Sequence, residues 1–590
     1  MYLAKKSVLK HPIRFLFVLA LGLSGSALLA QSAPNVILIV TDDQGIGDLG
    51  CHGNPWLKTP NLDAFYQSSV RLTDFHVSPL CTPSRAALMT GQYPINNGAW
   101  ATYKGRDALS DGVYTMANLF QSQGYQTALF GKWHLGDNYP VRPTDCGFET
   151  AIHHQAGGVG ELSDYWGNSY FEDVYMVNNE PKQFEGYCTD IWFAETMKFI
   201  EHQQEKPFFV YLATNAPHDP LIVDSSYAAP YKHLEGDQIV SANLYGMIAN
   251  IDENFGRLID FLDKKDLAEN TIVIFMTDNG TRFGYSPDGK LGYNMGLKGI
   301  KGSKWEGGHR VPFFIKWPQK NVGGGRDLPH LSAHVDILPT LAGLCNLPLP
   351  EGLALDGRNL SNLITGKTDS LPQQSVFVHH RQDWRPPEPI QQSCILQGPW
   401  RLVNGQALYH IIQDPLQQND VAEAHPDLVQ SLLAQNTHFF DQSQARTTFS
   451  ELPCAVVGSG YQQETKLTIQ HAIGDAKGIW KAEQVAEGVK NPNSTYAIEI
   501  AEKGNYLISC RRWPKECPGP LWGTPTENPK NLFSYQPIQP EKVQIKIANQ
   551  ILEKMVDGKE EAVTFQVQLS PGKTLLTCDF IEGNESYGVY

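Results

Sequence analysis

Two pairs of adjacent polar residues each follow a short apolar segment. Asp42-Asp43 comes after residues 35–40 (NVILIV), and Asp278-Asn279 comes after residues 271–276 (TIVIFM). Because ligands of open parallel sheets bind beyond the carboxyl ends of the strands, these side chains could meet there. Three carboxylates and an amide oxygen at one place would need a cation, and such oxygen donors favour calcium or magnesium over zinc. The same residue types also form turns and cap helices, so the two pairs alone leave both interpretations open.

Two further segments contain side chains that could supply a nucleophile or bind an anion. Cys81 precedes Pro83 and Arg85 and opens a short helical pattern in residues 81–91 (CTPSRAALMTG). A cysteine there could be a thiolate of lowered pKa, but a buried, inert thiol is the simpler interpretation. Residues 124–134 (GYQTALFGKWH) place Lys132 and His134 two positions apart after a short strand. Alternate residues of an extended chain point the same way, so both side chains could face one site.

Together, the last two segments resemble the signatures of the type I, formylglycine-dependent sulfatases, C-x-P-S-R-x-x-x-L-x-T-G and G-Y-x-T-x-x-x-G-K-x-H. Both signatures match at every specified position and in the expected order. The resemblance continues through residues 35–45 (NVILIVTDDQG), 217–220 (PHDP), 277–280 (TDNG), 301–308 (KGSKWEGG) and 408–422 (LYHIIQDPLQQNDVA). It therefore covers most of residues 35–440 and leaves residues 451–590 outside.

The resemblance implies a nucleophile made after translation. In that family the signature cysteine is oxidised to formylglycine (3-oxoalanine), and Cys81 occupies its position. One hydroxyl of the hydrated aldehyde could attack sulfur and release the alcohol, after which the other could collapse to the aldehyde and expel sulfate. The expected partners are a formylglycine-generating maturation enzyme and a sulfated small molecule or oligosaccharide as substrate.

The resemblance also assigns roles to the other polar residues. The family's calcium ligands match Asp42, Asp43, Cys81, Asp278 and Asn279. Arg85 and Lys132 match residues that hold the formylglycine and the sulfate, and His134 matches one that bonds the diol. His218 and Lys301 match the pair at the leaving oxygen, where His218 would be the general acid. Lys301 is preferred to Lys298 and Lys304 because the family's lysine precedes a glycine and stands five residues before Glu-Gly-Gly.

Three groups of residues have less definite expectations. Relatives often use one more residue after Phe148 to contact sulfate, and no single candidate can be chosen among His153, His154, Gln155 and Ser163. For Trp166 and Tyr170, ordinary packing is favoured over substrate contact. A second sub-domain lines the mouth of the site in relatives, and the residues hypothesised to select the substrate from it are His379, His380, Arg381 and Trp384.

The elements that must position these residues predict an α/β fold. Residues 35–40, 207–213 and 271–276, and more briefly 127–130, are continuous apolar runs typical of strands buried on both faces of a parallel sheet. Helical patterns over residues 115–123 and 243–264 lie between them. We therefore expect a mixed, mostly parallel central sheet flanked by helices, as the resemblance to alkaline-phosphatase-like and sulfatase folds also implies.

The rest of the chain suggests additional domains, since a single core seldom organises more than about 250–300 residues. A smaller α+β sub-domain is indicated by a helical pattern at 334–344 and strand patterns at 375–379 and 400–403. From about residue 451 the texture changes to short alternating segments, which favours a β-sandwich-like domain. Those segments are residues 496–500, 506–510, 542–547, 563–569 and 574–580. The predicted division is a signal peptide at 1–30, a catalytic core at 31–345, the sub-domain at 346–450 and the β-rich domain at 451–590.

The first 30 residues predict export. Lys5, Lys6, Lys10 and Arg14 precede an apolar run at residues 15–30 that ends in small residues, as in a secretory signal peptide. That run is shorter than the roughly 20 residues of a spanning helix, so we expect a periplasmic or secreted protein without stable membrane insertion. Ten cysteines in 590 residues do not make a disulfide scaffold. Cys510 and Cys517 could pair, and the sequence does not decide this.

Charge and competing activities complete the expectation. The formal net charge of −15 becomes −19 without residues 1–30, which argues against nucleic acid as a partner. One alternative is a phosphodiesterase or phosphonate monoester hydrolase of the same superfamily. Another is a non-catalytic carbohydrate-binding protein, although the nucleophile and all the expected metal ligands are present. The favoured prediction is an exported, calcium-dependent sulfatase that acts on a sulfated carbohydrate.

Overall fold

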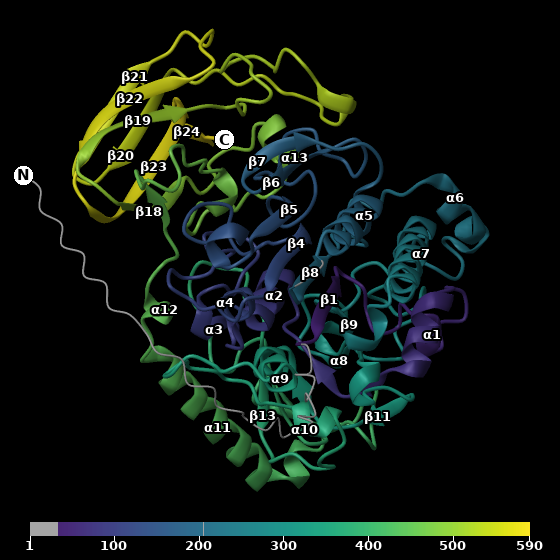
Figure 1. Ribbon diagram of the computed structural model, residues 1–590. Helices are drawn as coiled ribbons and strands as arrows, with labels where there is room; N and C mark the ends of the chain where they lie inside the picture. Colours follow the sequence, from purple (N-terminus) through teal and green to yellow (C-terminus); the bar gives the residue numbers. More distant parts are fainter. Residues whose placement is uncertain (1–32, 204–205) are drawn as a thin grey trace, which may run out of the picture.

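In this computed structural model, the structure describes residues 33–203 and 206–590 (Figure 1). The expected signal peptide at residues 1–30 lies outside the described residues, so it stays a prediction. Among the helices that are described, none has both the length and the apolar character needed to cross a bilayer.

A ten-stranded sheet forms the centre of the molecule, with strand order β11-β2-β10-β9-β1-β8-β4-β5-β6-β7. β1 (Asn35–Thr41) is paired in parallel with β8 (Phe208–Ala213) and β9 (Thr271–Thr277), and β4 (Gln126–Lys132) is parallel to β8. The remaining strands are β2 (Val70–Leu72), β5 (Thr150–His154), β6 (Val174–Val177), β7 (Glu180–Gln183), β10 (Phe313–Lys316) and β11 (Arg326–Leu328). β10 and β6 pair antiparallel with their neighbours, so the sheet is mixed but mostly parallel, as predicted.

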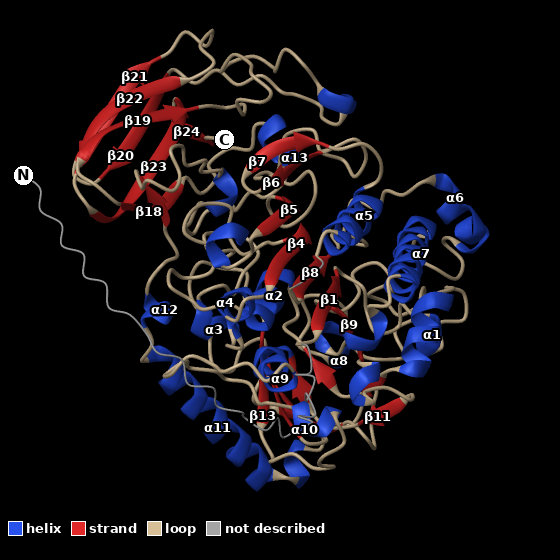
Figure 2. Cartoon of the chain, viewed as in Figure 1, coloured by secondary structure: helices blue, strands red, loops and turns tan. Residues whose placement is uncertain are grey.

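Both faces of the central strands β1, β8, β9 and β4 are buried, which explains their continuous apolar residues. Val36, Leu38 and Val40 point into one hydrophobic core, while Ile37 and Ile39 point into the other. Helices cover both faces (Figure 2). The core around Ile37 is closed by α1 (Pro60–Ser68), α5 (Cys188–Glu201) and α7 (Ala242–Lys264). The core around Val36 is closed by α2 (Cys81–Thr90), α4 (Met116–Ser122) and α9 (Ile337–Leu344).

The two predicted helices at 115–123 and 243–264 are α4 and α7, and each begins directly after a residue that caps its N-terminus. Thr115 caps α4 by accepting a hydrogen bond from the Asn118 N–H, and Ser241 caps α7 in the same way through Leu244. The pattern at 334–344 is a 3-10 turn, His334–Asp336, followed by α9. Four short helices lie in the connections: α3 (Pro94–Asn97), α6 (Ser225–Ala228), α8 (Glu306–His309) and α10 (Ser361–Ile364).

A second, antiparallel sheet has the order β13-β14-β15-β16. Its strands are β13 (Ser375–His379), β14 (Ser393–Gln397), β15 (Trp400–Val403) and β16 (Ala407–His410), and α11 (Pro426–Gln444) packs on it. The predicted strands at 375–379 and 400–403 are β13 and β15. The short α12 (Thr447–Ser450) follows α11, and β3 (Phe75–His76) pairs with β12 (Ser332–Ala333).

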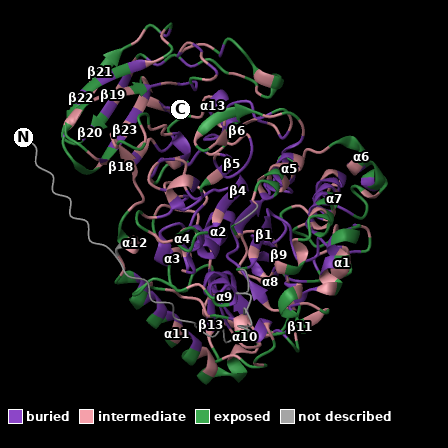
Figure 3. Cartoon of the chain, in the orientation of Figure 1, coloured by how far each residue is buried: buried purple, intermediate pink, exposed green. Residues whose placement is uncertain are grey.

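The C-terminal region contains two more sheets. One includes β17 (Ala455–Val457), β18 (Thr495–Ile500), β23 (Gly572–Glu582), β20 (Lys542–Ile547), β21 (Gln550–Met555) and β24 (Glu585–Gly588). The other pairs β19 (Gly504–Cys510) with β22 (Val563–Leu569). Buried and exposed residues alternate along β22, and inward residues of both sheets share one hydrophobic core (Figure 3). The alternating pattern therefore predicted the β-rich character of this region correctly.

The cysteine contact in this region differs from the pair considered in the sequence. Cys510 Sγ lies 2.6 Å from Cys578 Sγ in the opposite sheet. The Cys517 thiol instead contacts the Glu527 carbonyl oxygen, at 3.5 Å. Cys510 in β19 and Cys578 in β23 both point into the shared hydrophobic core, which brings the two thiols together. Their spacing in the sequence did not indicate this contact.

Candidate active site

The two acidic pairs meet at the carboxyl end of the central sheet. β1 and β9 are in register up to Thr41 and Thr277, so Asp42-Asp43 and Asp278-Asn279 leave the sheet side by side. The Asp43 N–H donates to Asp278 Oδ1 at 3.2 Å, and Asn279 Nδ2 donates to Asp43 Oδ1 at 2.8 Å. All four side chains are buried. The two pairs therefore meet beyond the carboxyl ends of their strands, as the sequence analysis expected.

Two oxygens of this cluster lack hydrogen bonds. Within the described part of the chain, Asp43 Oδ2 and Asn279 Oδ1 are buried and have no hydrogen-bond partner. Such acceptors are costly to leave unsatisfied. Ligand atoms of Asp42, Asp43, Cys81 and His218 also lie within 4.8 Å of one another. Because most of the available donors are hard oxygens, the site fits a divalent cation of the calcium or magnesium type.

Cys81 is the first residue of α2 and faces the acidic cluster. Its Sγ lies 3.5 Å from Asp42 Oδ1 and is almost fully buried. Burial and the neighbouring Asp42 carboxylate raise the pKa of the Cys81 thiol far above its ordinary value. The lowered-pKa thiolate considered for this cysteine is therefore wrong, and the unmodified side chain would be a poor nucleophile at neutral pH.

Three buried cations surround the acids. Lys132 Nζ donates to Asp42 Oδ2 at 2.6 Å, and Lys301 Nζ lies 2.6 Å from Asp43 Oδ1. Arg85 reaches Asp278 Oδ2 through Nε at 2.9 Å and through Nη2 at 2.8 Å. Burial disfavours the charged lysines, but the carboxylates prevail and the pKa values of both lysines are raised.

The charges of this cluster have a chemical consequence. Three carboxylates face three cations, so the protein groups alone balance. Burial opposes ionisation of Asp43, but Lys301 and His218 hold its pKa below the ordinary value. By contrast, burial and the Asp42 charge raise the pKa of Asp278 to about 6. A divalent cation would give the cluster a net positive charge, which suits a small anion such as a sulfate ester.

The two predicted histidines flank the cluster. His134 Nε2 lies 3.2 Å from the Thr102 carbonyl oxygen, and His218 Nδ1 lies 2.7 Å from the Asp219 carbonyl oxygen. His218 Nε2 therefore faces the acids, 3.8 Å from Asp43 Oδ2. Burial lowers the pKa of both imidazoles. The backbone is strained here, because Asp43 (φ 57°) and His134 (φ 55°) adopt left-handed conformations that often occur at functional sites.

The four candidates for an extra sulfate contact separate clearly. His154 is paired with Lys132 in the β4–β5 register, and among the described residues its buried Nε2 has no hydrogen-bond partner. His153 Nδ1 contacts the His154 carbonyl oxygen at 3.0 Å. Ser163 Oγ lies 3.0 Å from Thr468 Oγ1 and 3.3 Å from Gln470 Oε1, so it belongs to the boundary with the C-terminal region. Gln155 contributes its backbone N–H to Asp164 at 3.1 Å. His154 thus has the best placement of the four.

Trp166 and Tyr170 pack as expected. Trp166 is buried against Phe533 and Tyr590 of the C-terminal region, with ring centroids 5.1 and 5.5 Å away. Tyr170 is buried, and its hydroxyl donates to the His218 carbonyl oxygen at 2.6 Å, which helps to fix that loop.

The four residues proposed for substrate selection do not form one group. His379 is half-buried and stacks on Phe439, with 6.0 Å between the ring centroids. His380 lies beside Gly302, the neighbour of Lys301. Arg381 pairs with Asp383 at 3.7 Å, and Trp384 Nε1 donates to Asp475 at 3.4 Å. The strand pattern at 375–379 did not show that the His379 ring packs against Phe439.

Glu161 was missed by the sequence analysis. Its Oε2 accepts from the Gly157 N–H at 3.1 Å. A Cβ at Gly157 would meet His134 Nε2 at 2.7 Å and Glu161 Oε2 at 2.8 Å, so this carboxylate lies close to His134. Burial raises its pKa, although His218 and Lys132 oppose the shift. The stretch Gly157-Gly158 before it was the only signal, because glycines there permit the close approach.

A second group of potential metal ligands is engaged by protein. Ligand atoms of His76, Glu306 and His309 lie within 4.8 Å of one another in the described chain. Glu306 Oε1 accepts from Arg401 Nε at 2.7 Å, and His76 Nδ1 lies 3.0 Å from His309 Nδ1. The guanidinium of Arg401 therefore takes the place that a cation would need.

Comparisons with known proteins agree with this site. A family model described as "Sulfatase" matches residues 34–347. Human steryl-sulfatase is 30% identical over 432 residues, covering 59% of this chain and 72% of the relative. Human arylsulfatase A is 33% identical over 402 residues, covering 62% of this chain and 74% of the relative.

Solved structures give the same result for the fold. The structure of Ps i-CgsB in complex with k-i-k-neocarrahexaose has a TM-score of 0.63 at 27% identity and covers 72% of this chain and 95% of that chain. The phosphonate monoester hydrolase of Agrobacterium radiobacter shares the fold at a TM-score of 0.51 and 19% identity. With both signatures in place around the buried cation and acid cluster, the chain belongs to the type I sulfatases of the alkaline-phosphatase-like superfamily and is a sulfuric ester hydrolase.

Proposed function

We propose that this enzyme is an exported, calcium-dependent sulfatase whose nucleophile is a formylglycine made from Cys81. The observation that carries the proposal is the buried, charge-balanced cluster around Cys81, in which Asp43 Oδ2 and Asn279 Oδ1 have no hydrogen bond to any described residue. A thiol with a raised pKa would be a poor nucleophile there. A hydrated aldehyde at the same position would supply a hydroxyl that can attack sulfur.

The residues that would hold the calcium ion are Asp42, Asp43, Asp278, Asn279 and the modified Cys81. When bound, the ion would neutralise negative charge and polarise the sulfate ester. The oxygen-rich donor set supports calcium over zinc. The identity of the metal as calcium is part of the proposal.

The chain's own residues would hold the ester and move the proton. Lys132 and Arg85 supply fixed positive charge beside Cys81, and His134 and His154 each offer a ring nitrogen that has no hydrogen-bond partner in the described chain. On the other side, His218 Nε2 would take up a proton and give it to the departing alkoxide oxygen. Lys301 would stabilise the charge that develops on that oxygen.

Two observations support a sulfated carbohydrate as the substrate class. The neighbouring structure of Ps i-CgsB contains a neocarrahexaose. The N-terminal pattern of residues 1–30 supports export, which would give access to extracellular polysaccharides.

Peptide mass spectrometry across residue 81 tests the nucleophile. Protein made with a formylglycine-generating enzyme should lose the thiol sulfur at Cys81 and gain an aldehyde. Cys81→Ala should abolish turnover of 4-nitrophenyl sulfate, while Cys345→Ala, a change to another buried cysteine, should retain it. An active Cys81→Ala protein would disprove the proposal. Faster turnover of a phosphate diester or phosphonate monoester would instead favour the alternative activity.

A further inference from the structure

A segment of the C-terminal region reaches the catalytic cluster. Lys481 forms an antiparallel β-bridge with Glu161, and the Leu162 N–H donates to the Trp480 carbonyl oxygen at 2.9 Å. Figure 1 shows α13 (Ala482–Ala486), which follows directly, close to β6 and β7. The family match ends at residue 347, so residues 480 and 481 lie outside it.

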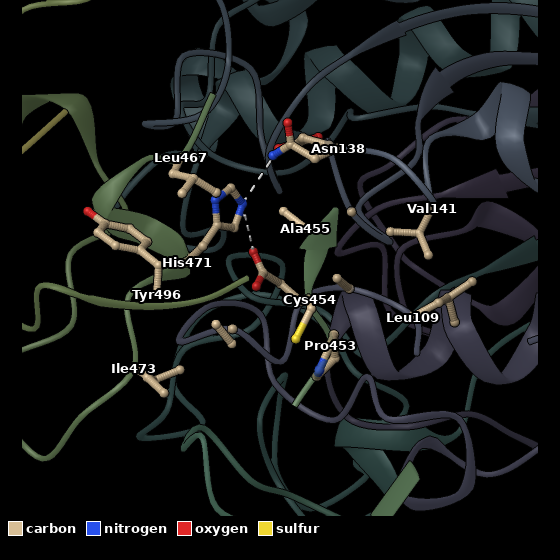
Figure 4. A pocket seen from close by; sticks show the side chains of 16 residues that line it. Leu109, Asn138, Val141, Pro453, Cys454, Ala455, Leu467, His471, Ile473 and Tyr496 are labelled. Atoms are coloured by element: carbon tan, nitrogen blue, oxygen red, sulfur yellow. Dashed lines mark ion pairs between the residues drawn. The ribbon is translucent and has the colours of Figure 1, made fainter. Parts of the chain in front are cut away.

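The same segment is anchored firmly to the core. Gln470 accepts from the Lys104 N–H at 3.0 Å, and Trp480 packs on Tyr103 with ring centroids 5.4 Å apart. His471 lies between two core carboxylates, 3.5 Å from Asp107 Oδ2 and 3.8 Å from Asp137 Oδ2. It borders a hollow lined by side chains of both regions (Figure 4). Contacts of this kind hold Lys481 at a fixed position relative to His218.

Lys481 shares a carboxylate with Arg282 next to the general-acid histidine. Asp219 Oδ1 lies 3.6 Å from His218 Nδ1 and 3.5 Å from Arg282 Nε, and Asp219 Oδ2 lies 3.8 Å from Lys481 Nζ. Two cations flank the Asp219 carboxylate here in a protein of net charge −15, and the Glu161 carboxylate lies close to the same histidine. The side chains of Lys481 and Arg282 are both 46% exposed, so they can still bind a ligand.

Exposure increases steadily from the acids outwards. Asp43 is fully buried, the His218 side chain is 10% exposed, and that of Asp219 is 23% exposed. Lys481 and Arg282 follow at 46%. This gradient marks the side of the cluster from which solvent and substrate approach, and it is the side on which the leaving alcohol would lie.

We propose that Lys481 of the C-terminal region, together with Arg282, determines specificity by binding a second anionic group on the substrate. That group would be another sulfate or a carboxylate on the sugar that carries the reacting ester, or on its neighbour. Two cations at the exit beside His218 complement such a group, and a mono-sulfated phenol offers nothing to bind them. The inference rests on the proposed function, because only there is His218 assigned to the side of the cluster from which the alcohol leaves.

Binding measurements test this independently of turnover. Calorimetry on the full calcium-loaded chain would use inorganic sulfate as a single anion and sucrose octasulfate as a polyanionic saccharide. Lys481→Ala and Arg282→Ala should each weaken octasulfate binding by about fivefold to tenfold, and their effect on sulfate should stay within twofold. The matched control is Lys490→Ala, which removes an exposed lysine of the same region that pairs with Glu585. Lys481→Arg should retain most of the affinity because it keeps the charge.

Two results would overturn the proposal. One is an equal loss of affinity for both anions, because Lys481 would then act only through the fold. The other is unchanged octasulfate binding in both variants, or the same loss in Lys490→Ala. Turnover of 4-nitrophenyl sulfate, measured on the same samples, reports separately on the proposed function. The failure of the anion-binding proposal can therefore be distinguished from the failure of the proposed sulfatase activity.

Discussion

The central sheet and the C-terminal sheets are both built of strands, but the strands of the two regions differ in which residues they bury. β1 and β9 are buried on both faces, and their polar residues are confined to the carboxyl ends, where Asp42, Asp43, Asp278 and Asn279 meet. In β22, by contrast, buried and exposed residues alternate along the strand. The sheet that is buried on both faces holds charged groups in place at the ends of its strands. The alternating strands form a separate region with its own hydrophobic core.

The difference has a consequence for specificity. The cluster at the end of the central sheet is almost fully buried, so under the proposed function we expect it to recognise little more than the sulfate group itself. The C-terminal region reaches the cluster through Trp480 and Lys481 rather than through its strands. Under our proposal, one of the two residues that select the substrate, Lys481, therefore lies on a part of the chain that can change separately from the acid cluster.

The largest expected effect tests the catalytic side of the comparison. Asp43→Asn removes a charge and a proposed calcium ligand, and it should lower kcat/KM on 4-nitrophenyl sulfate by about 10³-fold or more. Metal analysis should show less calcium bound per chain than in the unaltered protein. Glu553→Gln, which changes an exposed acid of β21, should alter neither value. Full calcium occupancy and normal turnover in Asp43→Asn would contradict the assignment.

A second prediction concerns the proton at the leaving oxygen. His218→Ala should reduce kcat by about 10²–10⁴-fold for esters of ordinary alcohols, which need a proton to leave. The loss should be much smaller for 4-nitrophenyl sulfate, whose leaving group is already stable as an anion. Steady-state kinetics on both esters measure the ratio, and His233→Ala provides an exposed histidine as control. Equal losses on the two substrates would show that His218 only positions the ester.

A third prediction concerns the C-terminal sheets. Phe565 is buried between them, so Phe565→Ala should destabilise this region by about 3–5 kcal/mol. Turnover of 4-nitrophenyl sulfate at low temperature should change less than twofold, since the acid cluster is elsewhere. Calorimetric unfolding measures the first effect, with outward-facing Thr564→Ala as control. A loss of aryl sulfate turnover as large as that of Asp43→Asn would show that the two regions are not separable.

The smallest effect concerns the boundary between the two regions. Burial raises the pKa of Asp107 to about 7 in the folded chain, against an ordinary value of 3.8. The folded state therefore holds this proton more tightly than the unfolded chain, and the contribution of Asp107 to stability falls as pH rises from about 4 to 7. Urea unfolding at pH 5 and pH 7 should show a smaller pH dependence in Asp107→Asn, by about 1–3 kcal/mol. An identical pH dependence in the two proteins would mean that His471 already keeps Asp107 ionised.

Much of the fold was predictable because its signals are local. The continuous apolar runs became β1, β8 and β9, and the alternating runs became the C-terminal strands. Spacing of this kind reflects whether one face or both faces of a strand are buried, and neighbouring residues determine it. The boundaries at residues 345 and 450 remain predictions, and so do the signal peptide and the roles of the site residues.

By itself, the sequence determined the strands that end in acids and the motif residues Cys81, Lys132 and His134. Only the tertiary structure decided that Ser163 serves the domain boundary and that His154 stands beside Lys132. The same holds for Glu161 and Lys481, which are 320 residues apart and lie together at the approach to His218. Contacts between distant segments depend on how whole sheets and loops pack, and no local pattern along the chain encodes them.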